Sequence, residues 1–125
     1  KNPYTIKVDI PGHFTMYRTL NYLSDDIRGE LIGRFIRDSL DVAKAGDVNK
    51  DHVIDVLDAI ELQKNWGTSN SNTDLNFDKI VDKKDMDFII KNYGLQNNTV
   101  SDAPNPKTYY KGDSLDTVLS NLGLK

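Results

Sequence analysis

The segment from Asp47 to Gly67 recurs 27 positions later as the segment from Asp74 to Gly94. What recurs is a run of oxygen-bearing side chains followed by a short amphipathic stretch, and each copy closes on Lys, Asn, an aromatic residue and Gly. The spacing is identical in the two runs, which read Asp47, Asn49, Asp51, Asp55, Asp58 and Asp74, Asn76, Asp78, Asp82, Asp85. This repeat predicts two similar loop–helix units.

Oxygen-bearing side chains at alternate positions of a loop of about twelve residues are typical of calcium sites, because Ca²⁺ takes roughly 6 to 8 oxygen ligands. The seventh position offers a backbone carbonyl, here of Val53 or Ile80, whose side chain can turn toward the core. Several carboxylates in one loop repel one another without a cation. We therefore predict two calcium ions, one in each loop. The predicted ligands are Asp47, Asn49, Asp51, Val53, Asp55 and Asp58 in the first loop and Asp74, Asn76, Asp78, Ile80, Asp82 and Asp85 in the second.

The later acidic residues of each loop have a second explanation. Asp55 and Asp82 stand where helix N-caps are expected, and Asp58 and Asp85 fall in the first helical turn, near the positive end of the helix dipole. The two roles are compatible. Capping alone does not require Asp, Asn and Asp at alternate positions upstream in both copies, so the pattern favours calcium.

The sixth position of each loop departs from the usual calcium loop, in which a glycine makes a sharp turn. His52 and Lys79 occupy it here. A left-handed backbone at a non-glycine residue costs about 1 to 2 kcal/mol, and Lys79 also places a positive charge beside the ion. We expect both loops to fill at millimolar calcium, the second more weakly.

Two helices are expected after the loops, over residues 55–66 and 82–93, with Gly67 and Gly94 as left-handed stops. Their apolar stripes should pack on each other. The packing residues are Ala59, Ile60, Leu62, Gln63 and Trp66 in the first helix and Met86, Phe88, Ile89, Ile90 and Tyr93 in the second. So small a unit buries little surface, and bound metal would add folding free energy.

The flanks divide the chain into residues 1–44, 45–94 and 95–125. Residues 1–12 alternate as a half-buried strand that ends in a Pro-Gly turn, a second strand continues through Phe14 and Met16 toward Leu20, and an apolar run at residues 31–36 suggests a third. Residues 95–106 are typical of a non-regular connector. A short final helix is predicted between a cap at Ser114 and a stop at Gly123. Its apolar positions are Leu115, Val118, Leu119 and Leu122.

The motifs GDVNKD, ending at Asp51, and DLNFD, ending at Asp78, are each followed by an apolar pair, Asp, two residues, Asp and a short helix. They resemble a type I dockerin. A paired EF-hand sensor fits less well, because its loops follow an entering helix and end in Glu, whereas a polar run precedes Asp74. The resemblance implies a mainly α dockerin fold of two antiparallel calcium-loop-helix units, here with an N-terminal β segment and a short C-terminal helix.

The resemblance also implies a non-catalytic module that docks on a cohesin module of another protein. The residues carried over as contacts are Val56, Leu57, Gln63 and Lys64 in the first unit and Lys83, Lys84, Ile90 and Lys91 in the second. An exposed Val56 and Leu57 would form an apolar hot spot, while Lys83 and Lys84 could equally be a solvated face. Because the two faces differ, we expect one preferred docking orientation. The alternative is a calcium-stapled module that braces the end of a secreted hydrolase without binding cohesin.

The N-terminal strands resemble immunoglobulin-like or carboxypeptidase-regulatory-like modules, and the flanks suggest a secreted multimodular parent, more similar to a subtilisin-like serine peptidase than to a glycoside hydrolase. We expect an extracellular or cell-surface monomer whose export signal lies upstream. Its net charge of −3 and scattered basic residues argue against nucleic-acid binding. The sequence has no membrane-spanning stretch. His13 and His52 stand in no catalytic motif, so we expect no enzymatic activity in this chain.

Overall fold

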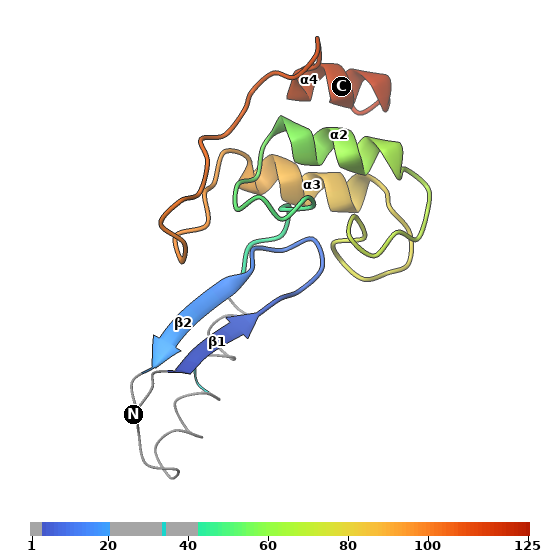
Figure 1. Cartoon of the computed structure of the whole chain (residues 1–125). Coiled ribbons are helices and arrows are strands. Elements are labelled where there is room, and N and C mark those ends of the chain that lie inside the picture. The colour runs from blue at the N-terminus through green and yellow to red at the C-terminus, as the bar shows by residue number, and fades with distance from the viewer. Residues whose placement is uncertain (1–3, 21–33, 35–42) are drawn as a thin grey trace.

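A computed structural model describes residues 4–20, 34 and 43–125 of the chain. It contains the strands β1 (Tyr4–Val8) and β2 (Met16–Leu20) and the helices α2 (Val56–Lys64), α3 (Lys83–Asn92) and α4 (Leu115–Asn121). Figure 1 shows the two strands projecting from a helical part in which α2 packs against both α3 and α4. No helix in the described ranges is long and apolar enough to cross a membrane.

The two strands form an antiparallel hairpin in which Val8 pairs with Met16 and Tyr4 with Leu20. The predicted pair of strands and the turn at Pro11 and Gly12 are thus confirmed. The third apolar run, at residues 31–36, lies outside the described residues except for Arg34. Arg34 is α-helical, so the prediction of a strand is wrong at that residue.

The helices α2 and α3 begin at the predicted caps. Asp55 and Asp82 each accept a hydrogen bond from a backbone N–H of the first turn, and Asp58 and Asp85 accept in return from the N–H of the cap residue. These reciprocal bonds satisfy N–H groups that a helix start otherwise leaves unpaired. Gly67 and Gly94, which follow the helices, have φ angles of 79° and 86°, as predicted for left-handed stops.

The two loops are connected to the opposite helices by equivalent pairs of backbone hydrogen bonds. Ile54, the eighth residue of the first loop, donates to Leu95 O (2.9 Å) and accepts from Gly94 N–H (2.8 Å), just beyond α3. Val81, at the same place in the second loop, makes the same two bonds (2.7 Å each) with the residues just beyond α2. Each loop is therefore fixed to the far end of the other unit.

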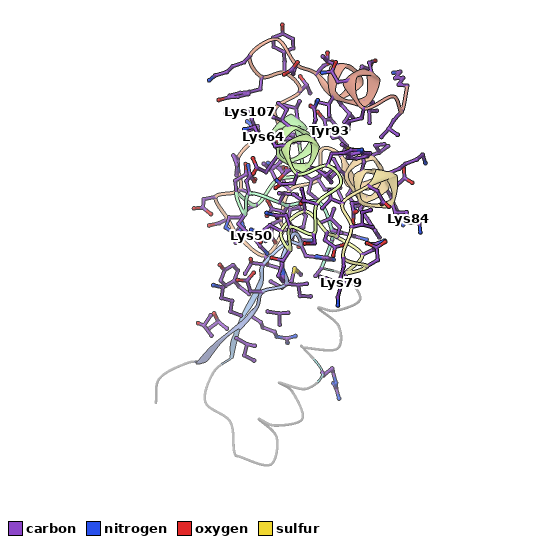
Figure 2. The ribbon with its side chains drawn as sticks, turned by 90° about the vertical axis from the view of Figure 1, so that its right-hand side faces the viewer. Lys50, Lys64, Lys79, Lys84, Tyr93 and Lys107 are labelled. Atoms are coloured by element: carbon purple, nitrogen blue, oxygen red, sulfur yellow. The ribbon has the colours of Figure 1, made fainter. Side chains whose placement is uncertain are left out.

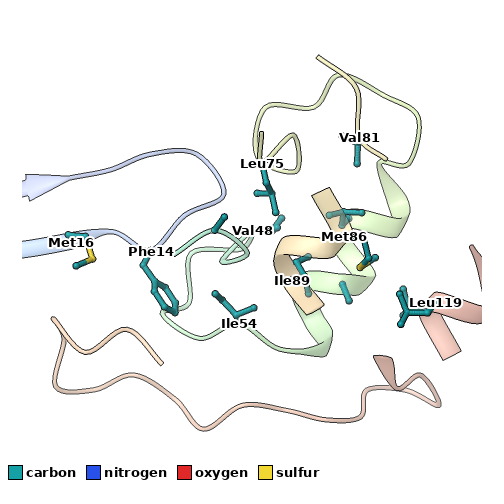
Figure 3. Packing of buried hydrophobic residues seen from close by; sticks show 13 residues of the cluster. Phe14, Met16, Val48, Ile54, Leu75, Val81, Met86, Ile89 and Leu119 are labelled. Carbon is teal, nitrogen blue, oxygen red and sulfur yellow. The ribbon is translucent and has the colours of Figure 1, made fainter. Parts of the chain in front are cut away.

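The core lies between the helices and the loops (Figure 3). Met86 and Ile89 of α3 contribute to it, Trp66 and Tyr93 pack against its edge as predicted, and Ile90 is 42% exposed, so the prediction that Ile90 joins the packing of the two helices is wrong. The buried members are Phe14, Met16, Ala45, Val48, Ile54, Ala59, Leu62, Leu75, Val81, Met86, Ile89, Val118 and Leu119. Residues from the hairpin, both loops and α4 therefore share one core.

The C-terminal segment, residues 95–125, runs back over the first unit. It is non-regular through the predicted connector and then forms α4, whose cap at Ser114 is as predicted. On its way it pairs with the start of α2: Val56 N–H donates to Lys107 O (3.1 Å), and Lys107 N–H donates to Asp55 Oδ2 (3.0 Å). Val56 is 0% exposed as a result of this packing, so the prediction that it forms an exposed hot spot is wrong.

Candidate metal centre

Three carboxylates converge in each loop. Oxygen atoms of Asp47, Asp51 and Asp58 all lie within 4.8 Å of one another, and the equivalent atoms of the second loop do the same. Two oxygens bound to one Ca²⁺ are at most about 4.6 to 5.2 Å apart, twice the metal–oxygen distance. The second cluster consists of Asp74, Asp78 and Asp85. Both clusters therefore have the dimensions of a calcium site.

The first residue of each loop is held by backbone N–H groups of the turn that follows it. Asp47 accepts from Asp51 N–H (3.2 Å) and His52 N–H (3.1 Å). Asp74 accepts from Asp78 N–H (3.2 Å) and Lys79 N–H (2.8 Å). The first and fifth ligand positions thus approach each other through hydrogen bonds within the loop itself.

The twelfth residue closes the loop. Asp58 Oδ1 accepts from Val48 N–H (2.8 Å) and Asn49 N–H (3.3 Å), while Oδ2 accepts from the N–H of the helix cap (2.9 Å). Asp85 repeats the pattern with Leu75, Asn76 and its own helix cap at 2.6, 3.3 and 2.9 Å. One carboxylate in each unit therefore ties the beginning of the loop to the start of the helix.

The loops need four left-handed residues that are not glycine. His52 and Lys79, at the sixth positions, have φ angles of 73° and 71°, which confirms the expected departure from a glycine turn. Lys50 and Phe77, at the fourth positions, have φ angles of 59° and 60°. No sequence pattern predicts this second pair, because neither Lys nor Phe favours a left-handed backbone.

Burial disfavours the negative charge of the loop carboxylates. Burial, and next the charge of Asp51, raises the pKa of Asp47 to about 7. Burial raises the pKa of Asp58 to about 8, against the opposing hydrogen bond from Asp55 N–H. In the second loop burial also raises the pKa of Asp85. A divalent cation would offset this unfavourable charge and favour the ionised carboxylates.

An unpaired amide oxygen supports the metal interpretation for the second loop. Asn76 Oδ1 is buried and has no hydrogen-bond partner among the described residues. Asn76 is the predicted third-position ligand, between the carboxylates of Asp74 and Asp78. A buried polar atom without a partner is costly unless an unseen ligand satisfies it. The donors in both loops are oxygens, which suit a hard cation such as calcium.

The ninth-position residues make different contacts from the three clustered carboxylates. Asp55 accepts from Leu57 N–H (3.1 Å) as well as from Lys107, and Asp82 accepts from Lys84 N–H (3.0 Å). Neither belongs to a carboxylate cluster in the described part of the chain. Their capping role is therefore observed, whereas direct or water-mediated calcium binding by these residues stays a prediction.

The seventh-position side chains lie in contrasting surroundings. Val53 is 1% exposed and forms a β-bridge with Gln96 of the C-terminal segment. Ile80 is 44% exposed, so the prediction that its side chain turns to the core is wrong. The C-terminal segment passes the first loop, where Asn97 N–H donates to His52 O (2.8 Å), and this accounts for the burial of Val53.

The residues predicted to contact a partner also differ between the units. Val56 is buried, Leu57 and Gln63 are half-buried, and only Lys64 is exposed in the first set. All four members of the second set are exposed: Lys83, Lys84, Ile90 and Lys91. Figure 2 shows Lys84 on the outer side of α3, while Lys64 and Lys107 lie on the side of α2.

The fold and the two loops define a duplicated protein with EF-hand-like loop–helix units. Residues 45–104 match the family model of the dockerin type I domain, and this part of the chain belongs to that family. Dockerin domains are non-catalytic, bind calcium and bind cohesin modules, and proteins that carry them are typically extracellular. No curated protein and no solved structure matches the chain.

Proposed function

We propose that this chain attaches its parent protein to a cohesin module in a calcium-dependent manner. The observation that carries the proposal is the pair of equivalent carboxylate clusters within the segment that matches the dockerin family. Each cluster is built by the same hydrogen bonds at the same internal spacing. A single acidic cluster could be incidental, whereas two matched clusters support a retained metal-binding role.

We assign one calcium ion to each loop. The ligands are those that the sequence predicts, with the clustered carboxylates and Asn76 best supported by the geometry. Bound calcium would relieve the repulsion among the carboxylates and stabilise the turns. The antiparallel packing of the two units belongs to the same proposal and is supported by the crossed backbone pairs of Ile54 and Val81.

The docking face proposed here is the outer face of α3. Its lysines and Ile90 are exposed, whereas the C-terminal segment covers the start of α2. Among the described residues, Lys83 forms an ion pair with Asp87 at 3.2 Å, whereas Lys84 and Lys91 form no ion pair. The excess of positive charge suits a cohesin surface that is acidic around an apolar spot for Ile90. Docking would then occur in one orientation.

The alternative function is a brace within a secreted parent. It is favoured by the flanks, because the hairpin and α4 both pack into the core of the dockerin segment. Such packing would hold neighbouring modules in a fixed arrangement without any cohesin. The parent as a secreted hydrolase, its extracellular location and the monomeric state also remain proposals.

Binding of the full chain to a panel of cohesin modules, in calcium and in chelator, separates the two functions. Attachment predicts calcium-dependent capture by at least one cohesin, and failure with every cohesin would favour the brace. A double variant, Lys84→Glu and Lys91→Glu, should weaken capture by roughly tenfold or more if α3 is the docking face. The control is Lys64→Glu, a single charge reversal on the exposed surface of α2, which should leave capture unchanged and is compared with Lys84→Glu alone as well as with the double variant.

A further inference from the structure

The turn between β1 and β2, residues 9–15, packs against both loops. Gly46 N–H, just before the first loop, donates to Gly12 O (2.8 Å), and Phe14 N–H donates to Lys44 O (2.9 Å). Gly12 has a φ of 73°, and a Cβ there would overlap Leu75 Cδ2 of the second loop and lie 2.7 Å from Asn72 O. The turn fits so closely that a methyl group has no room.

Lys50 of the first loop fastens this turn. Its amino group donates to Ile10 O (2.7 Å) and His13 O (2.5 Å) and forms an ion pair with Asp9 (2.8 Å). Figure 2 shows Lys50 where the hairpin meets the helical part. Lys50 stands between Asn49 and Asp51, the third and fifth positions of the loop, so the turn is tied to the backbone that carries two predicted ligands.

The second loop reaches the same turn from its own fourth position. The rings of Phe77 and His13 stack with centroids 5.7 Å apart and an interplanar angle of 7°. Phe77 is the counterpart of Lys50 in the repeat, and both residues are left-handed. The two strained fourth positions thus contact one hairpin turn, Lys50 through charge and Phe77 through ring stacking.

We infer that the β1–β2 turn and the two calcium loops form a calcium-linked joint: filling the loops fixes the hairpin against the dockerin segment, and the docked hairpin in turn tightens calcium binding. The two effects must be reciprocal, because a coupling free energy between two binding events acts equally on both. Loops with repelling carboxylates and strained residues are loose when empty, and an ordered loop presents Lys50 and Phe77 to the turn. This inference rests on the calcium part of the proposed function and needs no cohesin.

Lys50→Met in the full chain tests the joint through the direction in which calcium affinity changes. Removing a positive charge beside a cation site should, through charge alone, tighten calcium binding. The joint predicts the opposite, a first-loop affinity weaker by roughly fivefold or more, at the low end of typical coupling. A calcium titration followed by the NMR amide signals of each loop reports the two sites separately.

Lys79→Met is the matched control. Lys79 is also a left-handed loop lysine, but no hydrogen bond or ion pair links its amino group to the turn within the described part of the chain. Its loss should leave second-loop affinity unchanged or tighter. Lys50→Met binding calcium as tightly as the unaltered chain, or more tightly, would overturn the joint.

Hydrogen exchange of the unaltered chain supplies a second test that needs no variant. The amides of Phe14 and Gly46, which pair across the turn, should exchange roughly tenfold or more faster without calcium. Equal exchange rates with and without calcium would contradict the joint, as would the absence of calcium binding. Failure to find a cohesin would affect neither result, so the two proposals fail separately.

Discussion

The two loop–helix units have the same hydrogen bonds within their loops but differ in which of their surfaces are exposed. Asp58 and Asp85 accept the same three backbone hydrogen bonds, and each unit has left-handed residues at its fourth and sixth positions. The side chains at the seventh loop position break this equivalence, because Val53 is buried while Ile80 is exposed. The duplicated sequence thus determines the metal loop, whereas the flanking chain determines which surfaces remain free.

The difference arises from where the chain goes after each helix. Beyond Gly67 it crosses directly to the second loop, where Val81 N–H pairs with Thr68 O. Beyond Gly94 it continues past the first loop and then returns to α2 through Lys107. Within the described part of the chain this cover lies on the first unit, and the outer residues of α3 stay exposed.

Removing the closing carboxylate should have the largest effect. Asp58→Ala leaves three N–H groups of a buried region without their acceptor and removes a predicted ligand. We therefore expect the free energy of unfolding, measured in the presence of calcium, to fall by about 3 kcal/mol or more. Thermal or urea unfolding measures it. Asp85→Ala is the counterpart and should cost a similar amount. A small loss of stability for one variant and a large loss for the other would show that the two closing carboxylates are not equivalent.

Exchanging the residues at the matched positions 56 and 83 tests the outer difference. Val56→Lys places a charge beneath the C-terminal segment and should cost about 3 kcal/mol of unfolding free energy. Lys83→Val changes an exposed site and should stay within about 0.5 kcal/mol. Denaturant unfolding of both variants is sufficient. Equal costs would show that the two faces are equally covered.

The metal-free protein should lose stability as the pH rises. Asp47 and Asp58 have pKa values of about 7 and about 8 because burial disfavours their charged forms. The unfolded pKa is about 3.9, so the native state binds these protons more tightly, and the stabilisation is complete at low pH and lost as the pH passes through the raised values. For calcium-depleted protein, we expect the free energy of unfolding measured in urea to fall by about 2 kcal/mol or more between about pH 5 and pH 8.5.

Two controls accompany the pH prediction. Asp58→Asn should remove more of the pH dependence than Asp85→Asn, because the larger pKa shifts lie in the first loop. Saturating calcium should suppress the trend, since it holds the carboxylates ionised. Stability that is flat or rises with pH in the calcium-depleted protein would contradict the burial of these charges.

Relieving the strained sixth positions should have the smallest effect. Lys79→Gly removes both a strained backbone and a positive charge, and should tighten calcium binding by roughly tenfold, or about 1.4 kcal/mol. His52→Gly should gain less, because it removes a ring whose Nδ1 lies 3.4 Å from Asn97 Nδ2 and against which Tyr17 packs edge-on. Calorimetry on both variants compares the loops. No gain for Lys79→Gly would show that this turn carries no strain.

Sequence patterns identified the features that depend on neighbouring residues. The caps at Asp55, Asp82 and Ser114 and the stops at Gly67 and Gly94 were predictable, because each depends on a few adjacent residues. The ligand pattern is local in the same sense, and the carboxylates at positions one, five and twelve converge as its spacing implies.

The features that sequence patterns missed depend on distant segments. Val56 is covered because Lys107 returns to the start of α2, and nothing near Val56 encodes that contact. Ile80 has the same loop position as Val53, but among the described residues it forms no β-bridge like the one between Val53 and Gln96. The left-handed Lys50 and Phe77 are explained by their shared contact with the hairpin turn.

The most direct measurement is a calorimetric calcium titration of the full chain after removal of all calcium. Two equivalent clusters predict two binding events, with the second loop the weaker because of Lys79. One event would show that a loop with complete internal geometry no longer binds metal. No event would contradict the account and reduce the acidic pattern to helix caps and turns.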